Sequence, residues 1–425
     1  MKKYKIRLRY TKHQRYIQRK VLKRRRKNKY IKTKHRNKLT PYTSKILLNL
    51  KENSFAIEGI RFDSYVHFDV PQQFCFSRNP ENSLYFLRRL YSALMNSKVC
   101  EIHFSHLNCK HIGVCASTIM DIIVLECIKW RKSIKKPIKV SGDLIGDKVS
   151  STQEVDNLVK SSGLLKHLNI YDTPIINTET LELINNGDSA GASEKSIEYI
   201  NKSLKRHGVT LTKEGVNLFS TFFGEIIDNC VEHGGPNVEW FTLGHYSYDN
   251  INKVGRCKLC IVDFGETIYE SLKYHSSKDM QKRLKKLSKK SWISQKSISN
   301  EETLYTVFSL QQRVSRVVKK GVIRGNGTME YIEAFLNLFN STNVEHKSVF
   351  SITSGRTSIL FDGRYETIAK KYSAGFKNKV ITFNDSHNLY DPPDPNYVKF
   401  IRHKFPGTII SMDLYLDSKY LKRSN

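Results

Sequence analysis

Leu218–Gly235 reads LFSTFFGEIIDNCVEHGG, and it is the most informative stretch of the chain. Its apolar residues at 219, 222, 223, 226 and 227 form one stripe of a helix. Because residues three and four apart are neighbours on a helix, a second face gathers Glu225, Asp228, Asn229 and Glu232. Gly234-Gly235 predicts the end of that helix. Taken alone, the pattern fits either an exposed, salt-bridged surface or a polar site backed by a core.

Two later segments favour a site. Lys258–Ile268 reads KLCIVDFGETI, a short apolar strand that ends in Asp263-Phe264-Gly265. A carboxylate at a strand end can accept from the amine of a planar base, and glycine lets the base approach the backbone. Residues 321–331 read GVIRGNGTMEY, a glycine turn that opens a helix. Free N–H groups at such a turn can bind phosphate, although many such turns are only turns.

The order and spacing of these three segments resemble the N, G1 and G2 boxes of the GHKL, or Bergerat-fold, ATPases. The short form EIIDNCVEHGG is most similar to the branch of histidine kinases and anti-sigma-factor kinases. The resemblance covers roughly residues 205–415. It implies a C-terminal α/β sandwich with a mixed sheet, ATP and Mg²⁺ as ligands, and ATPase or Ser/Thr-type protein kinase activity.

The resemblance also implies roles for particular residues. Asn229 would ligate Mg²⁺ through its side-chain oxygen, and Glu225 would be the general base one helical turn away. Asp263 would accept from the adenine amine. The other implied nucleotide-binding residues are Gly265, Thr267, Arg324, Gly325, Gly327 and Thr328.

This sequence departs from the family pattern at two places. Thr267 stands where G1 has its second glycine, and Met329 stands where G2 has its third. A side chain at either place narrows the pocket or restricts the lid, so ATP binding is the firmer expectation and turnover is an open question. The lid would lie between Glu266 and Lys320 and includes the basic, helix-like KDMQKRLKKLSKKSW. Its cations could serve phosphate, a protein partner, nucleic acid or only solvation.

Residues 55–175 alternate strand-like and helix-like segments and resemble an STAS domain. The resemblance rests on VCEIHFSHLNCKHIGVCASTIMDIIVLEC and on PIKVSG followed by VDNLVKSSGLLKHLNI. The phosphorylatable D-S-S-G of that family is absent, and Ser117 is the nearest hydroxyl, so we expect an interaction role. Because anti-sigma kinases act on STAS partners, the pairing implies ATP-dependent control within one chain or between the subunits of a homodimer.

The net charge of +31 is concentrated at the N-terminus, where residues 1–50 hold twenty Lys or Arg and no Asp or Glu. This basic arm contains tyrosines, and Lys, Arg and Tyr can together bind nucleic acid. Residues 1–45 are therefore either a nucleic-acid contact, a solubilising tail or a contact for an acidic protein. No apolar stretch predicts a membrane span or a secretory signal. Eight scattered cysteines are typical of the cytoplasm, and the lone Cys257-x-x-Cys260 lacks a second ligand pair for zinc.

We therefore expect four sections: a flexible basic arm at 1–50, an STAS-like α/β domain at 55–175, a Gly/Ser-rich linker at 176–204 and a GHKL-type domain at 205–420. Three functions fit: an ATP-hydrolysing or phosphotransferring regulator, a silent module gated by nucleotide, and a nucleic-acid-binding protein with a vestigial ATPase fold. In the last part of the chain, 351–361 predicts a hairpin and 405–416 a closing strand.

Overall fold

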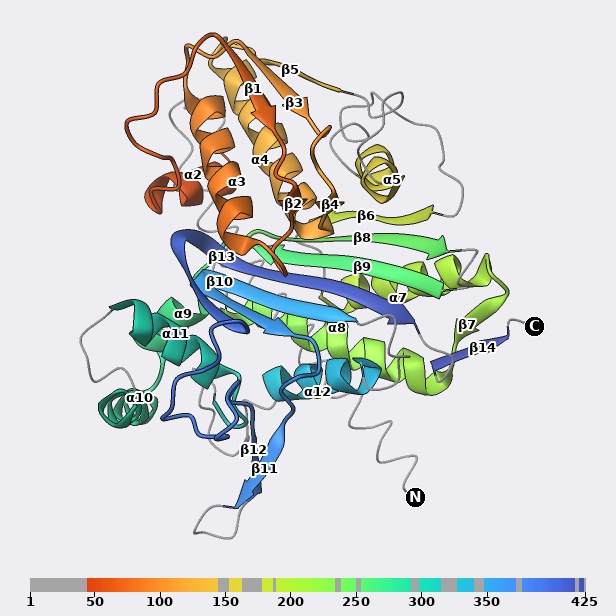
Figure 1. Ribbon diagram of the computed structural model, residues 1–425, viewed down its shortest axis with the longest axis vertical. Helices are drawn as coiled ribbons and strands as arrows, with labels where there is room; N and C mark the ends of the chain where they lie inside the picture. The colour runs from red at the N-terminus through yellow and green to blue at the C-terminus, as the bar shows by residue number, and fades with distance from the viewer. Residues whose placement is uncertain are drawn as a thin grey trace, which may run out of the picture. The chain divides into compact units, whose positions relative to one another are not determined.

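The computed structural model describes most of the chain beyond the basic arm: residues 44–143, 153–162, 178–185, 189–233, 238–249, 254–291, 298–314, 327–339, 348–371, 377–416 and 420–423. All of these residues belong to one compact unit, 44–425. The unit is α/β, with helices packed on parallel and antiparallel sheets (Figure 1). The expected arm lies mostly outside the described residues, but its end does not: helix α2 spans Lys45–Glu52 and buries Ile46, Leu47 and Leu50.

A five-stranded sheet forms the centre of the C-terminal half. Its order is β10 (Val349–Phe361), β13 (Val398–Leu416), β9 (Val254–Asp263), β8 (Trp240–Asp249) and β6 (Thr178–Asn185). Every pairing between these strands is antiparallel, so the expectation of a mixed sheet there was wrong. The short connection between β8 and β9 explains part of this, because it leaves no room for the crossover that parallel neighbours need.

This sheet is apolar on both faces. Along β9, Cys257, Leu259 and Ile261 pack into one hydrophobic cluster, whereas Cys260 and Val262 pack into another. The strand reads as a continuous apolar run because successive side chains point to opposite faces and both faces are covered. The same alternation separates Cys257 from Cys260, so these two thiols cannot ligate one zinc ion.

One face carries the helices of the C-terminal half. Helix α8 (Lys213–His233) packs against α12 (Gly327–Phe339) and α7 (Ser189–Lys205), and all three contribute to one cluster with the sheet. The stripe predicted for α8 is buried, with Phe219, Phe222, Phe223, Ile226 and Ile227 at most 1% exposed. Figure 1 shows α8 and α12 on this side of the strands.

Within the expected linker at 176–204, the residues that the structure describes form β6 and most of α7. The Ser-rich composition misled the prediction, because the buried face of α7 carries serines beside larger apolar residues such as Ile200 and Leu204. Ser196 and Ser203 are fully buried, and each donates its hydroxyl to a backbone carbonyl of the preceding turn at 2.8 Å. These hydroxyls are satisfied within the helix, so they pack as small core residues.

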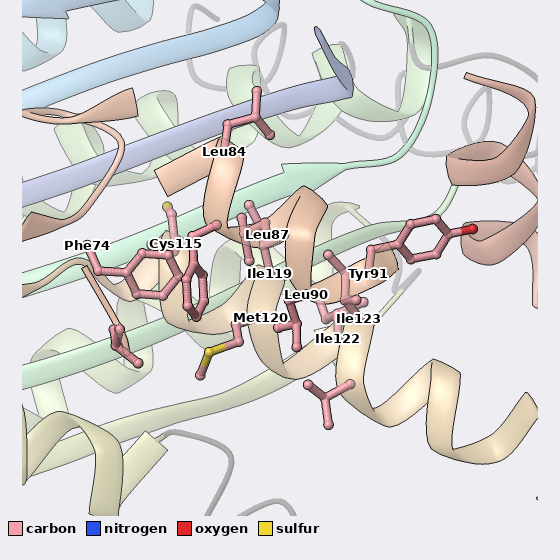
Figure 2. Packing of buried hydrophobic residues seen from close by; sticks show 14 of the residues in the cluster. Phe74, Leu84, Leu87, Leu90, Tyr91, Cys115, Ile119, Met120, Ile122 and Ile123 are labelled. Atoms are coloured by element: carbon pink, nitrogen blue, oxygen red, sulfur yellow. The ribbon is translucent and has the colours of Figure 1, made fainter. Parts of the chain in front are cut away.

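The opposite face carries the helices of the expected STAS-like segment. Helices α3 (Pro80–Met95) and α4 (Val114–Ser133) contact the sheet, α4 through β8, β9 and β13, and they share one hydrophobic cluster with it. Figure 2 shows Leu87 and Leu90 of α3 beside Ile119 and Ile123 of α4.

A parallel three-stranded sheet lies on these helices: β1 (Tyr65–Asp69), β3 (Glu101–Ser105) and β5 (Lys139–Gly142). The strand, helix, strand order predicted for this segment is confirmed by these elements. Ser117, the hydroxyl nearest to the missing phosphorylation motif, is 2% exposed in α4.

Smaller elements complete the unit. Helix α5 (Gln153–Ser162) lies against β6 and β8, and three short pairs join β2 (Gln73–Phe74) to β4 (His111–Ile112), β7 (Val209–Leu211) to β14 (Leu421–Arg423), and β11 (Ile368–Lys371) to β12 (Lys377–Val380).

The prediction of a hairpin at 351–361 was wrong. Gly355, at φ +60°, makes a bulge in the single strand β10, and residues on both sides of it pair with β13.

Three helices follow the end of β9: α9 (Ile268–His275), α10 (Lys278–Lys290) and α11 (Ile298–Ser309). They form a separate small hydrophobic cluster, built around Leu272, Leu284, Leu287, Leu304 and Phe308. This three-helix subdomain occupies the region in which the resemblance implies a lid.

Candidate functional site

A cavity of about 100 Å³ lies where helix α8, the end of β9 and the start of α12 meet. Its floor is the sheet, through Ile352 of β10 and Ile410 of β13. The three-helix subdomain forms another wall. The lining residues are Ile226, Asn229, Cys230, Asp263, Glu266, Ile268, Ser271, Leu272, Ser309, Leu310, Val314, Thr328, Tyr331, Ile352, Thr408 and Ile410.

Three residues singled out from the sequence therefore meet here: Asn229, Asp263 and Thr328. Each comes from a different segment, and 99 positions separate the first from the last. Helix α8 places Asn229 because Ile226 and Cys230 flank it on the buried side, and both also line the cavity. The amide is thus held at the boundary between the core and the cavity, with its helix anchored by the apolar stripe.

Asp263 is a buried carboxyl group in the lining of the cavity, and it is 3% exposed. The Gly265 N–H donates to its Oδ1 at 3.0 Å, and the Cys230 thiol and the Thr408 backbone also hydrogen-bond to this carboxyl group. Burial nevertheless raises the pKa of Asp263 to about 7, because the apolar surroundings disfavour the charged form more than these bonds favour it. A further donor from a ligand would favour the ionised form.

The Cys230 contact was not predicted from the sequence. It links helix α8 directly to the strand end that carries Asp263, and so it fixes two of the predicted motifs relative to each other. Its position next to Asn229 and one helical turn after Ile226 is the signal that could have revealed it.

A close approach of two strands shapes the turn after Asp263. A Cβ built on Gly407 would lie 2.0 Å from the Asp263 carbonyl oxygen, and Gly407 has φ +140°. Only glycine permits this contact. The DFG turn therefore depends on a glycine that lies more than 140 residues later in the chain and that our sequence analysis missed.

Thr267 has a structural role in this turn. It caps α9: its hydroxyl accepts from the Glu270 N–H at 3.1 Å, and the Glu270 carboxylate accepts from the Thr267 N–H at 3.0 Å. Its side chain is 1% exposed and does not line the cavity, whereas its neighbours Glu266 and Ile268 do. Gly265 is half-buried and serves the turn through its bond to Asp263.

Glu225 lies on α8 one turn before Asn229, half-buried and outside the lining of the cavity. Burial raises its pKa above the ordinary value, and the carboxylates of Glu330, Asp228 and Glu232 raise it further. A carboxyl group of this kind is a better proton acceptor than an exposed one. Glu330 comes from α12, so the acidic face of α8 continues onto the neighbouring helix.

The glycine turn before α12 is described only in part. Gly327 begins the helix, and Thr328 lies on the cavity, where its side chain hydrogen-bonds to Tyr331. Arg324 and Gly325 lie outside the described residues.

A second hollow, of about 530 Å³, lies between α8 and α12 and is lined partly by Glu214, Glu330 and Glu333. None of the residues predicted for nucleotide binding lines it, so the smaller cavity is the candidate site. Among the described residues, no three His, Cys, Asp or Glu side chains form a group that could hold a metal by themselves.

Comparison with protein-family models, with curated proteins and with solved structures gives no match for this chain. Every helix within the described ranges is too short or too polar to cross a bilayer.

Proposed function

We propose that this cavity binds the base of ATP and that the protein is a Mg²⁺-ATP-dependent regulator. The single observation that carries the proposal is that Asn229, Asp263 and Thr328, which the GHKL resemblance implies as ligands, line one cavity. Residues so far apart in the chain have no local reason to meet.

The residues present fit both ligands. Asp263 is a buried acceptor that an exocyclic amine could pair with, and glycine follows it at the turn. Asn229 offers one oxygen to Mg²⁺, an ion that usually takes one or two protein ligands and completes its shell with water and phosphate. The lack of a larger ligand group among the described side chains is compatible with that arrangement. When bound, Mg²⁺ would neutralise charge on the phosphates.

The size of the cavity favours a gated site. Small-molecule sites usually measure roughly 300–1,000 Å³, and this cavity is about 100 Å³. ATP therefore requires one wall to move. The three-helix subdomain is the candidate because it has its own hydrophobic cluster and contributes Leu272 and Val314 to the wall. Nucleotide binding would thus change the position of this subdomain, with or without turnover.

Titration of the full-length protein with ATP, with and without Mg²⁺, tests the proposal. We expect binding that depends on Mg²⁺, and Asn229→Ala should weaken it roughly ten- to hundredfold because a charge-assisted contact is lost. Asn217→Ala is the matched control, since Asn217 is exposed on the same helix away from this cavity. If the unaltered protein does not bind ATP, the proposal is wrong.

A phosphate-release assay then separates an enzyme from a gated module. If Glu225 is the general base, Glu225→Gln should retain ATP binding and lose turnover. If the protein is a silent module, the unaltered protein already releases no phosphate, while ATP still slows hydrogen exchange in α9 and α11.

A further inference from the structure

Helix α10 presents a surface that the proposed nucleotide site does not use. Its sequence is KDMQKRLKKLSKK, with seven cationic side chains and one acidic one. The helix is amphipathic, and Met280, Leu284 and Leu287 are buried in the cluster of the three-helix subdomain. Figure 1 shows α10 at the periphery beside α11. Its outer face is therefore built almost entirely from lysine and arginine.

The lysines on this face follow a line. Positions 278, 282, 285 and 289 are spaced by four, three and four residues, so they fall within a narrow arc of the helix. At 1.5 Å per residue the row is about 16 Å long. Lys286 and Lys290 flank it, and all six side chains are exposed. A duplex carries one negative charge per roughly 1.7 Å of its axis, so the row spans several phosphates.

Among the residues that the structure describes, little neutralises this charge. In the described part of the chain, the ion pair at this row joins Lys282 to Asp279 at 4.0 Å, with both side chains more than 80% exposed. Like charges three and four residues apart repel, and α10 contains several such pairs. A polyanion outside the helix would relieve that repulsion.

The chemistry of the face favours a phosphate backbone over other partners. A protein partner usually needs an aromatic or apolar anchor, and a membrane-bound amphipathic helix needs a free apolar face. The apolar residues of α10 are already buried in the protein. We propose that the lysine row of α10 binds the phosphodiester backbone of nucleic acid, independently of base sequence.

The test compares charge-removing and charge-keeping variants of the full-length protein. The triple variant Lys282→Gln, Lys285→Gln, Lys289→Gln removes the centre of the row. The triple Lys→Arg variant at the same positions keeps the charge. The control replaces three lysines of α7, Lys195, Lys202 and Lys205, with Gln. Binding is measured over a range of salt concentrations with a random-sequence DNA duplex and with a single-stranded RNA.

Each phosphate contact contributes about 0.9 to the slope of log K against log salt for a duplex. We therefore expect the Gln variant to reduce the slope by roughly 2–3 and the affinity by tenfold or more, while the Arg variant and the α7 control leave both unchanged. If the Gln variant loses binding only to the DNA duplex, the lysine row binds duplex DNA. If it loses binding only to the RNA, the row binds single strands.

Equal slopes for the Gln variant and the unaltered protein on both probes would overturn the proposal. The proposal would also be overturned if the Gln variant lost binding to phosphatidylserine vesicles but kept its binding to nucleic acid, since that result assigns the face to a membrane. Thermal unfolding checks that each variant folds, and the Gln variant should be at least as stable because repulsion is removed.

Discussion

The protonation of Asp263 should make the stability of this protein depend on pH in an unusual direction. Its folded pKa is about 7, whereas the ordinary value is 3.8. Between these values the folded state binds one proton more than the unfolded state. The free energy of unfolding should therefore fall as pH rises from about 4 to about 7, by about 1.4 kcal/mol per pH unit at most. Above the folded pKa this contribution is constant.

Asp263→Asn isolates the effect, because asparagine has nearly the same shape and does not titrate. Between pH 5 and pH 7 the unaltered protein should lose about 2 kcal/mol of unfolding free energy relative to the variant. Urea unfolding at a series of pH values, followed by tryptophan fluorescence, measures this difference. Other groups titrate in both proteins and cancel in the comparison. Parallel curves for the two proteins would refute the assignment of a buried, proton-binding carboxyl group to position 263.

Three further predictions concern stability. Gly407→Ala should destabilise the protein by about 3 kcal/mol or more, because the new Cβ would meet the backbone of Asp263. By contrast, Gly224→Ala in the middle of α8 should be neutral or stabilising by up to about 1 kcal/mol, since no atom lies within 4 Å of the added Cβ. Thermal unfolding compares the two glycine variants. Equal effects on stability would contradict the close contact between Gly407 and Asp263. Glu154→Ala should lower the free energy of unfolding by roughly 1.5–3 kcal/mol, because Glu154 pairs with two cations of β9 and so holds α5 on the sheet. Urea unfolding measures this change. If the variant is as stable as the unaltered protein, α5 is held by its apolar contacts alone.

Strong periodicity made part of the fold predictable. The stripe in α8, the apolar run of β9 and the amphipathic pattern of α10 each depend on burial that the local sequence displays. The order of the three motifs was also sufficient to select Asn229, Asp263 and Thr328, which line one cavity. The roles of these residues toward ATP and Mg²⁺ stay predictions.

The errors arose where the deciding contact lies far away in the chain. Gly355 looked like a turn, but pairing with β13 on both sides of it makes a bulge. The serines of α7 are a local exception: they looked like a linker, although each hydroxyl donates to the carbonyl four residues earlier once the helix has formed. The residues next to Asp263 in the sequence also do not indicate that position 407 must be glycine or that the Cys230 thiol donates to the Asp263 carboxylate. Tertiary context of this kind is absent from a local pattern.

The position of β13 in the sheet has a consequence for biosynthesis. This strand comes last in the chain among the five, yet it lies between β10 and β9. Until the ribosome has released residues 398–416, β9 has an unpaired edge, and both hydrophobic clusters lack side chains such as Phe405 and Met412. We therefore expect this sheet to be completed only after residues 398–416 have left the ribosome, and chains that terminate before this strand should aggregate or require a chaperone.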